Sequence, residues 1–132
     1  MAPFFEQEYD YSKYNVLAVD DIPLNLLLVQ KMLSRFNFTL RTAANGQLAL
    51  DAVAAKKPDL ILLDLMLPKL SGFEVCKLLK TDNATWRIPI IVMSTLSDPE
   101  SRDRATESGA DYFIPKPYDL ADTLAEIKKH LK

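Results

Sequence analysis

Short apolar runs alternate along the chain with longer segments in which apolar residues recur every three or four positions. The runs are predicted to be strands and comprise residues 16–19, 38–43, 60–63, 88–93 and 112–114. The intervening segments are predicted to be helices and comprise residues 23–36, 45–56, 71–80, 98–108 and a last stretch ending near residue 131. A strand followed by a helix, repeated five times, predicts an α/β domain.

Each predicted helix carries apolar side chains that we expect to face a core. The expected core residues are Leu24, Leu27, Leu28, Met32 and Leu33, then Leu48, Ala49, Ala52 and Val53, then Phe73, Val75, Cys76 and Leu79, and finally Leu120, Leu124, Ile127 and Leu131. In the helix predicted over residues 98–108, Ala105 is the only clear anchor. We therefore expect that helix to be weakly held.

The predicted strands are continuous apolar runs, as is typical of parallel strands covered by helices on both faces. Crossovers between such strands are right-handed. The prediction is an open, doubly wound, five-stranded parallel sheet. In this architecture the functional crevice lies at the carboxyl ends of the strands.

Composition narrows the class of protein. A chain of 132 residues with 48% hydrophobic and 26% charged residues fits one globular domain. Its net charge of −2 offers no basic surface for nucleic acid or anionic lipid. A single cysteine excludes an internal disulfide, and no apolar run could cross a membrane, so we expect a cytoplasmic protein. Residues 1–13 lack periodicity and are predicted to be an N-terminal arm or linker before a domain of residues 14–132.

Polar side chains follow four of the predicted strands. They are Asp20 and Asp21, Asp64, Ser94 with Thr95, and Lys116. Neighbouring strands lie about 4.8 Å apart, so these groups are expected to meet at one edge of the sheet. Taken singly, each could be a helix cap or a solvated loop residue, with Asp21 as a cap for the helix that begins at Pro23. Their recurrence at successive strand ends favours a shared site.

Three clustered carboxylates repel one another unless a cation joins them. Oxygen donors suit Mg²⁺, or Mn²⁺, better than zinc, and His130 and Cys76 lie within predicted helices away from the site. A carboxylate beside such a cation can attack phosphorus and form an aspartyl phosphate. A nearby lysine would offset charge on the phosphoryl oxygens.

These motifs, in this order, resemble the receiver domain of bacterial two-component response regulators over residues 14–131. The matching segments are Val19-Asp20-Asp21, residues 63–68 around Asp64, Ser71-Gly72-Phe73-Glu74, residues 89–94, Gly109-Ala110 and Lys116-Pro117-Tyr118. The resemblance implies a flavodoxin-like (βα)5 fold with strand order 2-1-3-4-5. It also implies a signalling module that is phosphorylated, and not a turnover enzyme.

The resemblance assigns roles to individual residues. Asp64 would accept the phosphoryl group. Asp21 and Asp64 would bind the metal directly, with Asp20 acting through water and Met66 through its backbone carbonyl. Ser94 would be the switch hydroxyl, Phe113 the aromatic that changes rotamer, and Lys116 the contact to a phosphoryl oxygen, with a cis bond to Pro117.

Two departures from the family pattern affect these roles. Thr95 follows the switch hydroxyl, where the family usually has a very small residue, so Thr95 narrows access or is itself the functional hydroxyl. We favour Ser94 because it lies five residues after Pro89, the family spacing. Met66 and Leu96 are apolar and offer no group to orient an attacking water, so we expect a long-lived aspartyl phosphate.

The resemblance also implies partners. A histidine kinase or histidine phosphotransfer protein would supply the phosphoryl group and dock on the first helix, although its aliphatic residues 26–29 could equally be core. The output face, formed by the fourth helix, the fifth strand and the fifth helix, would control a protein effector or a fused output domain, without direct nucleic-acid binding. The chain would be a monomer or a weak, phosphorylation-dependent dimer. The sequence leaves open a stand-alone regulator or part of a longer protein.

Two rival functions share the predicted layout. A phosphatase of the haloacid dehalogenase type would require a second aspartate two residues after Asp64, where this chain has Met66. A flavin or nucleotide module would require a Gly-, Ser- or Thr-rich phosphate loop after the first strand. That position holds Asp20-Asp21-Ile22-Pro23, which would repel phosphate without a metal.

Overall fold

A five-stranded parallel sheet forms the middle layer of the computed structural model, which describes residues 10–131. Its strands are β1 (Asn15–Val19), β2 (Thr39–Ala43), β3 (Leu60–Leu63), β4 (Ile90–Ser94) and β5 (Tyr112–Pro115), in the order β2-β1-β3-β4-β5. The helices are α2 (Pro23–Ser34), α3 (Gly46–Ala55), α4 (Gly72–Lys80), α5 (Pro99–Glu107) and α6 (Leu120–His130). The predicted fold class and strand order are confirmed.

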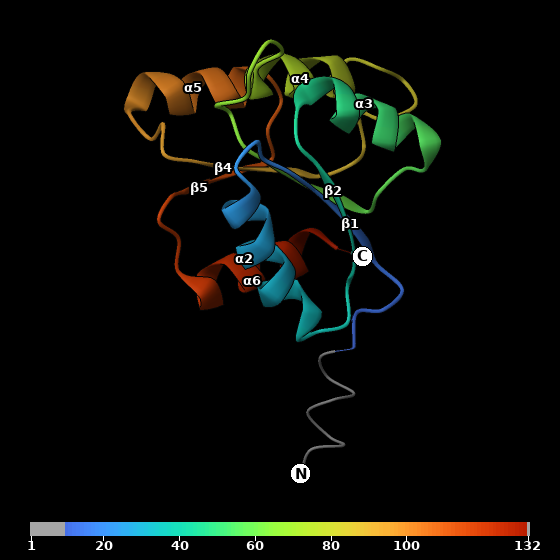
Figure 1. Ribbon diagram of the computed structural model, residues 1–132. Helices are drawn as coiled ribbons and strands as arrows, with labels where there is room; N and C mark the ends of the chain where they lie inside the picture. The colour runs from blue at the N-terminus through green and yellow to red at the C-terminus, as the bar shows by residue number, and fades with distance from the viewer. Residues whose placement is uncertain (1–9, 132) are drawn as a thin grey trace.

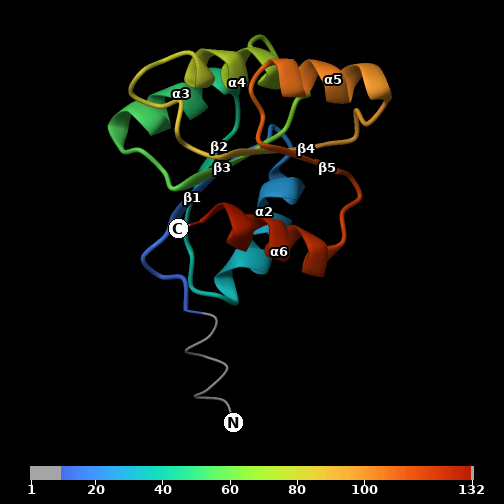
Figure 2. The same ribbon diagram turned by 180° about the vertical axis from the view of Figure 1, so that it is seen from behind.

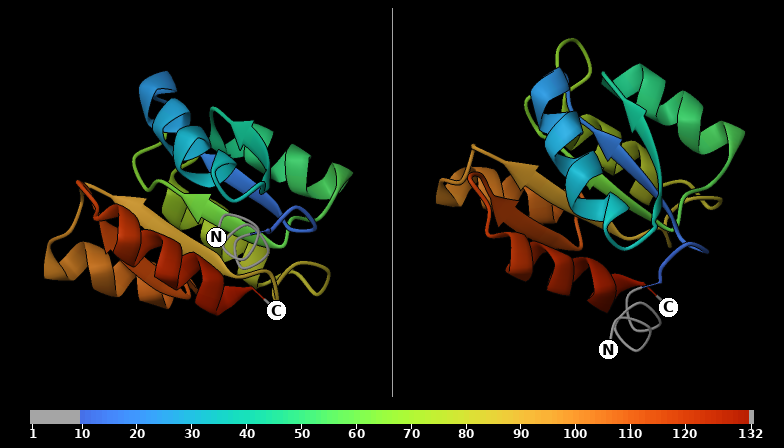
Figure 3. Two further views of the ribbon diagram at one scale, coloured as in Figure 1. Left: turned by 90° about the horizontal axis from the view of Figure 1, so that it is seen from below. Right: turned by 60° about the horizontal axis from the view of Figure 1, so that its bottom comes forward.

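The helices form two outer layers. α3, α4 and α5 cover one face of the sheet, whereas α2 and α6 cover the other (Figures 1 and 2). In Figure 3 the second face is seen from below, with α2 toward β1 and β2 and α6 toward β4 and β5. Two of the central strands show how the layers are held. Leu17, Val19, Ile61 and Leu63 pack in the core under α3, α4 and α5, and the alternate residues Val16, Ala18, Leu60 and Leu62 pack toward α2 and α6.

The strand register determines which side chains reach the functional edge. β1 and β3 are buried throughout, and Val19 lies opposite Leu63 in their parallel pairing. The residues that follow, Asp20 and Asp64, therefore leave the sheet at the same level. The backbone N–H of Asp64 donates to Val19 O at 3.0 Å, which extends the pairing up to the acidic residue.

Most helix starts are fixed by side-chain caps. Ser71 and Glu74 form a reciprocal capping box at the start of α4, and Asn45, Asp98 and Asp119 cap α3, α5 and α6. α2 differs, because its N-cap is Ile22 and no side chain caps it. The alternative role of Asp21 as the cap of this helix is therefore wrong.

Several expected core residues are exposed. In α2 the core face is formed by Val29, Met32 and Leu33, whereas Leu24, Leu27 and Leu28 are exposed. Residues 26–29 are all apolar, so the sequence pattern alone does not define the buried face of this helix. Leu48 and Leu120 are also exposed, whereas Ala49 and Val53 form the buried side of α3 and Ile127 that of α6. The expected α4 core is confirmed.

α5 is attached to the domain in an unusual way. Ala105 is its only buried residue, as predicted. Two arginines of this helix lie over aromatic rings of neighbouring elements: Arg102 is 4.8 Å from the ring centroid of Phe113 and Arg104 is 4.0 Å from that of Phe73. Such contacts are each worth about 0.5–2 kcal/mol. Cation–π contacts therefore supplement the little apolar burial that this helix has.

The first described residues pack against the domain. Tyr11 stacks on Phe38 with ring centroids 5.0 Å apart, and its N–H donates to Phe36 O at 2.8 Å. Residues 1–9 of the predicted arm lie outside the described residues, so the boundary between arm and domain remains a prediction. Among the described residues, no helix combines the length and apolar character needed to cross a membrane.

The buried Cys76 should make the free energy of unfolding depend on pH. Desolvation raises the pKa of its thiol from 9.0 to about 11, so between these values the unfolded chain loses a proton that the folded chain keeps. The free energy of unfolding should therefore fall as pH rises through this window. From pH 8 to pH 10 the wild type should lose about 1 to 1.5 kcal/mol more than Cys76→Ala does, measured by urea unfolding. Parallel loss in both proteins would contradict the assignment.

Candidate functional site

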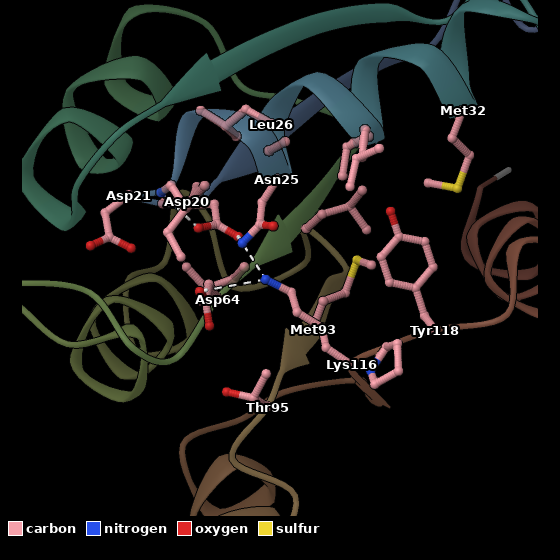
Figure 4. A pocket seen from close by; sticks show the side chains of 18 of the residues that line it. Asp20, Asp21, Asn25, Leu26, Met32, Asp64, Met93, Thr95, Lys116 and Tyr118 are labelled. Carbon is pink, nitrogen blue, oxygen red and sulfur yellow. Dashed lines mark hydrogen bonds and ion pairs between the residues drawn. The ribbon is translucent and has the colours of Figure 1, made fainter.

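Three carboxylates meet at the carboxyl edge of the sheet. Asp20 and Asp21 follow β1 and Asp64 follows β3, and one oxygen atom from each lies within 4.8 Å of the others. Asp20 and Asp64 are each only 6% exposed, whereas Asp21 is exposed. Figure 4 shows the three side chains side by side at one end of a cleft. The predicted clustering of these acids is therefore present.

Asp20 is held by its own loop and by α2. One carboxylate oxygen accepts a hydrogen bond from Ile22 N–H at 3.0 Å, and the other accepts one from the Asn25 side chain, also at 3.0 Å. Asn25 is not among the site residues predicted from the sequence. Its position in the first turn of α2, five residues after Asp20, was the available signal.

Lys116 joins the acidic cluster from the end of β5. Its ammonium nitrogen lies 2.7 Å from Asp20 Oδ2 and 3.6 Å from Asp64 Oδ2. The backbone N–H of Lys116 donates to Ser94 O at 2.9 Å, which fixes the loop, and the bond to Pro117 is cis as the resemblance implies. The lysine thus partly compensates two buried negative charges.

Asp64 is both buried and oriented. The backbone N–H of Met66 donates to its Oδ1 at 3.2 Å. Burial is the largest influence on the pKa of this carboxyl and raises it, and the charge of Asp20 raises it further; the Met66 hydrogen bond and Lys116 act in the opposite direction. A cation in the site would favour the ionised form, which is the form that can act as a nucleophile.

The two predicted hydroxyl candidates differ in their surroundings. The Ser94 side chain is fully buried, and its Oγ accepts a hydrogen bond from Leu96 N–H at 3.1 Å. Thr95 is exposed, lines the cleft, and its hydroxyl donates to Met66 Sδ at 3.4 Å. Phe113 is half-buried under Arg102 and does not line the cleft. The roles of Ser94, Thr95 and Phe113 as switch residues remain predictions.

The cleft continues well beyond the acidic cluster. It encloses about 1080 Å³ and runs between α2 and the segment that leads into α6. Its apolar part is lined by Leu26, Val29, Met32, Met93 and Tyr118. This part of the cleft could not be predicted from the sequence, because it depends on how α2 and α6 are placed across the sheet.

The donor set fits a hard divalent cation. In the described part of the chain, this is the one group of three or more acidic, histidine or cysteine side chains close enough to hold a metal. All of its side-chain ligands are oxygens, and Cys76 is buried within α4. Mg²⁺ binds well to one or two carboxylates together with water and a phosphate oxygen. The residues present therefore fit Mg²⁺ or Mn²⁺ and do not fit zinc.

Comparisons with known proteins identify the family. Residues 16–128 match the response regulator receiver domain family. Response regulator PleD of Caulobacter vibrioides is 38% identical over 113 residues, which cover 86% of this chain and 25% of PleD. Across the curated relatives of this kind, the chain spans between a quarter and about half of their length.

Solved structures show the same architecture. The signal receiver domain of a signal transduction histidine kinase from Syntrophus aciditrophicus has a TM-score of 0.84 at 30% identity, with 89% of each chain covered. The receiver domain of sensor histidine kinase PA1611 from Pseudomonas aeruginosa has a TM-score of 0.82 at 23% identity, covering 88% of this chain and 95% of that one, and shares the fold. The PA1611 domain has a magnesium ion coordinated in its active-site cleft.

The family match covers nearly all of the described residues, and it places the acidic cluster where receiver domains are phosphorylated. The chain belongs to the response regulator receiver domain family, whose members are signalling modules of two-component systems and not turnover enzymes.

Proposed function

We propose that this chain accepts a phosphoryl group on Asp64 and uses it to change the surface formed by α5, β5 and α6. One observation carries the proposal: a buried carboxylate at the end of β3 lies beside two further carboxylates and an ammonium group. That arrangement places charges of both signs around a single nucleophile, the Asp64 carboxylate. Phosphoryl transfer depends mainly on such positioning and electrostatic stabilisation.

In the transfer step, a carboxylate oxygen of Asp64 attacks the phosphorus of the donor. The new P–O bond forms as the bond from phosphorus to the donor breaks, and the donor keeps the electron pair. The Met66 N–H holds the carboxylate in a fixed orientation throughout, because it bonds to one of its oxygens. The buried strand β3 keeps the attacking group at a constant depth in the cleft.

Lys116 is positioned to change partner during this step. It is 2.7 Å from Asp20 and 3.6 Å from Asp64 before phosphorylation. When a phosphoryl group is added to Asp64, its oxygens carry more negative charge than the carboxylate did. Lys116 would then contact a phosphoryl oxygen and offset that charge.

Asp20, Asp21 and Asp64, together with the backbone carbonyl of Met66, would hold Mg²⁺ or Mn²⁺. When bound, the cation neutralises the carboxylates and reduces the repulsion between them and an incoming phosphoryl group. Among the expected ligands, Asp21 is the exposed carboxylate, so it lies where a cation could reach it from solvent.

The proposed switch begins at Ser94. Its hydroxyl would leave the Leu96 N–H and donate to the phosphoryl group, which would pull the β4–α5 loop inward. Phe113 would move into the space released, and Arg102 would lose its ring partner. α5 buries a single side chain, so a change of a few kcal/mol is enough to shift its position.

The exposed aliphatic residues of α2 suit the docking of a phosphodonor protein. Ile22, Leu24, Leu27 and Leu28 are exposed, and Ile22 and Leu28 line the cleft that contains the acidic cluster. We propose that a histidine kinase or a histidine phosphotransfer protein docks there, in the cytoplasm. The output would act on a protein effector or a fused output domain, without direct contact to nucleic acid, from a monomer or a weak phosphorylation-dependent dimer.

Chemical phosphorylation should identify Asp64 as the acceptor. Incubation with Mg²⁺ and acetyl phosphate should add one phosphoryl group, seen by intact mass, and Asp64→Asn should abolish the adduct because an amide is not a nucleophile here. Asp51→Asn is the matched control, since Asp51 is an exposed acid on α3 away from the cleft. An adduct that persists in Asp64→Asn would exclude Asp64 as the acceptor.

Binding of Mg²⁺ at the acidic cluster should stabilise the folded domain. Mg²⁺ at ten times its dissociation constant should stabilise the wild type by about 1.4 kcal/mol, measured by thermal unfolding. Asp21→Ala should remove most of this gain, because Asp21 supplies a ligand but little of the core. Asp51→Asn should retain the gain. Equal stabilisation of all three proteins would argue against this ligand set.

The proposed switch should be visible as a change in backbone hydrogen exchange. A phosphoryl mimic such as beryllofluoride should change hydrogen exchange within residues 94–118, because both the β4–α5 loop and α5 lie in that range. α4 should change less than α5, since a capping box and five buried residues hold it in place. Unchanged exchange across residues 94–118 would contradict the proposed route.

A further inference from the structure

Met66 lies at the rim of the acidic cluster as an exposed residue. It follows Asp64 by two residues, and its side chain is 52% exposed. Its backbone N–H donates to Asp64 Oδ1 at 3.2 Å, and its Sδ accepts a hydrogen bond from the Thr95 hydroxyl at 3.4 Å. The same residue therefore orients the acceptor carboxylate and covers part of the approach to it.

The other sulfur atoms in residues 10–131 are shielded. Met32 and Met93 are each 3% exposed and Cys76 is 1% exposed. Burial raises the pKa of the Cys76 thiol to about 11, which keeps it in the less reactive protonated form. Among the described residues, Met66 is thus the sulfur that a dissolved oxidant would reach first.

We propose that Met66 is a site of reversible oxidation by peroxides, and that its sulfoxide shortens the lifetime of the phosphoryl group on Asp64. The inference rests on the proposed function of Asp64. In the oxidation, the thioether sulfur takes one oxygen atom from hydrogen peroxide, the O–O bond breaks, and water is released. A methionine sulfoxide reductase reverses the change: two thiols supply two electrons and two protons, the sulfoxide oxygen leaves as water, and the thiols become a disulfide.

The effect on lifetime follows from the chemistry of the two forms. A thioether is apolar and a weak hydrogen-bond acceptor, so it excludes water from the rim of the site. A sulfoxide oxygen is a strong acceptor that the Thr95 hydroxyl can hold in place. A water bonded to that oxygen is then placed near the phosphorus, where positioning accelerates attack.

Hydrolysis then proceeds without a further reactant. The water oxygen bonds to phosphorus, the bond from phosphorus to the Asp64 oxygen breaks, and the carboxylate keeps the electron pair. Both water protons leave with inorganic phosphate. Oxidation of Met66 would therefore return the domain to its unphosphorylated state.

The test begins with the unphosphorylated protein. Mild hydrogen peroxide followed by peptide mapping should oxidise Met66 before Met32 or Met93. After removal of peroxide, the protein is phosphorylated with acetyl phosphate and Mg²⁺, the donor is removed, and loss of the adduct is followed by intact mass. The half-life should be at least about threefold shorter than in untreated protein. Treatment of the oxidised protein with the two methionine sulfoxide reductases, one for each epimer, and dithiothreitol before phosphorylation should restore it.

Two variants make the result specific. Met66→Leu keeps the backbone carbonyl and has no sulfur, so its half-life should be the same with and without peroxide. Met66→Gln places an amide oxygen near the position of the sulfoxide oxygen, so its half-life should be shorter than that of Met66→Leu without any oxidant.

The inference is overturned if Met66 is oxidised and the half-life is unchanged, or if peroxide shortens the half-life equally in Met66→Leu. Failure of the proposed function gives a different result, because no adduct would then form on Asp64 before any oxidation. A normal adduct whose lifetime is insensitive to Met66 oxidation would leave the proposed function intact.

Discussion

The structure depends on the burial of two carboxylates, Asp20 and Asp64, at the ends of adjacent strands. Leaving a buried charge without a partner costs about 3–5 kcal/mol. Lys116 lies 2.7 Å from Asp20, although it is separated from it by 96 residues of sequence. Asp20 therefore gains its cationic partner only when β5 has joined the sheet. This ion pair couples the first and last strands of the domain to the site itself.

Much of the fold could be predicted because its signals are local. Every strand and helix lies within a few residues of its expected position, and parallel strands necessarily bring Asp20, Asp64 and Lys116 to one edge. The exposure of Leu24, Leu27 and Leu28 could not be predicted, because α2 has apolar residues on more than one side. Asn25 and the apolar part of the cleft depend on contacts between elements, which the sequence pattern does not contain.

Two neighbouring helices on the same face of the sheet, α4 and α5, differ in how firmly they are held, and this difference suits signalling. α4 is fixed by a capping box and five buried residues, whereas α5 is fixed by one buried residue and two arginine–aromatic contacts. The stabilisation from apolar burial does not depend on how a ring is oriented, but a cation–π contact is lost when the ring turns away from the arginine. A rotation of Phe113 would therefore loosen α5 selectively, while the rest of the layer keeps its packing.

Residues 60–66 pass within a few positions from a buried strand to an exposed side chain. Leu60 to Leu63 are fully buried in β3, Asp64 lies just inside the cleft, and Met66 is exposed at its rim. The rigid strand fixes the depth of the carboxylate, and the turn after it fixes its orientation through the Met66 N–H. Because that turn also places the Met66 side chain at the rim, the orientation of the proposed nucleophile and the proposed control of water access would share one residue. Formation of the signal and its decay would then both depend on one backbone turn, and a change of the Met66 side chain would separate them.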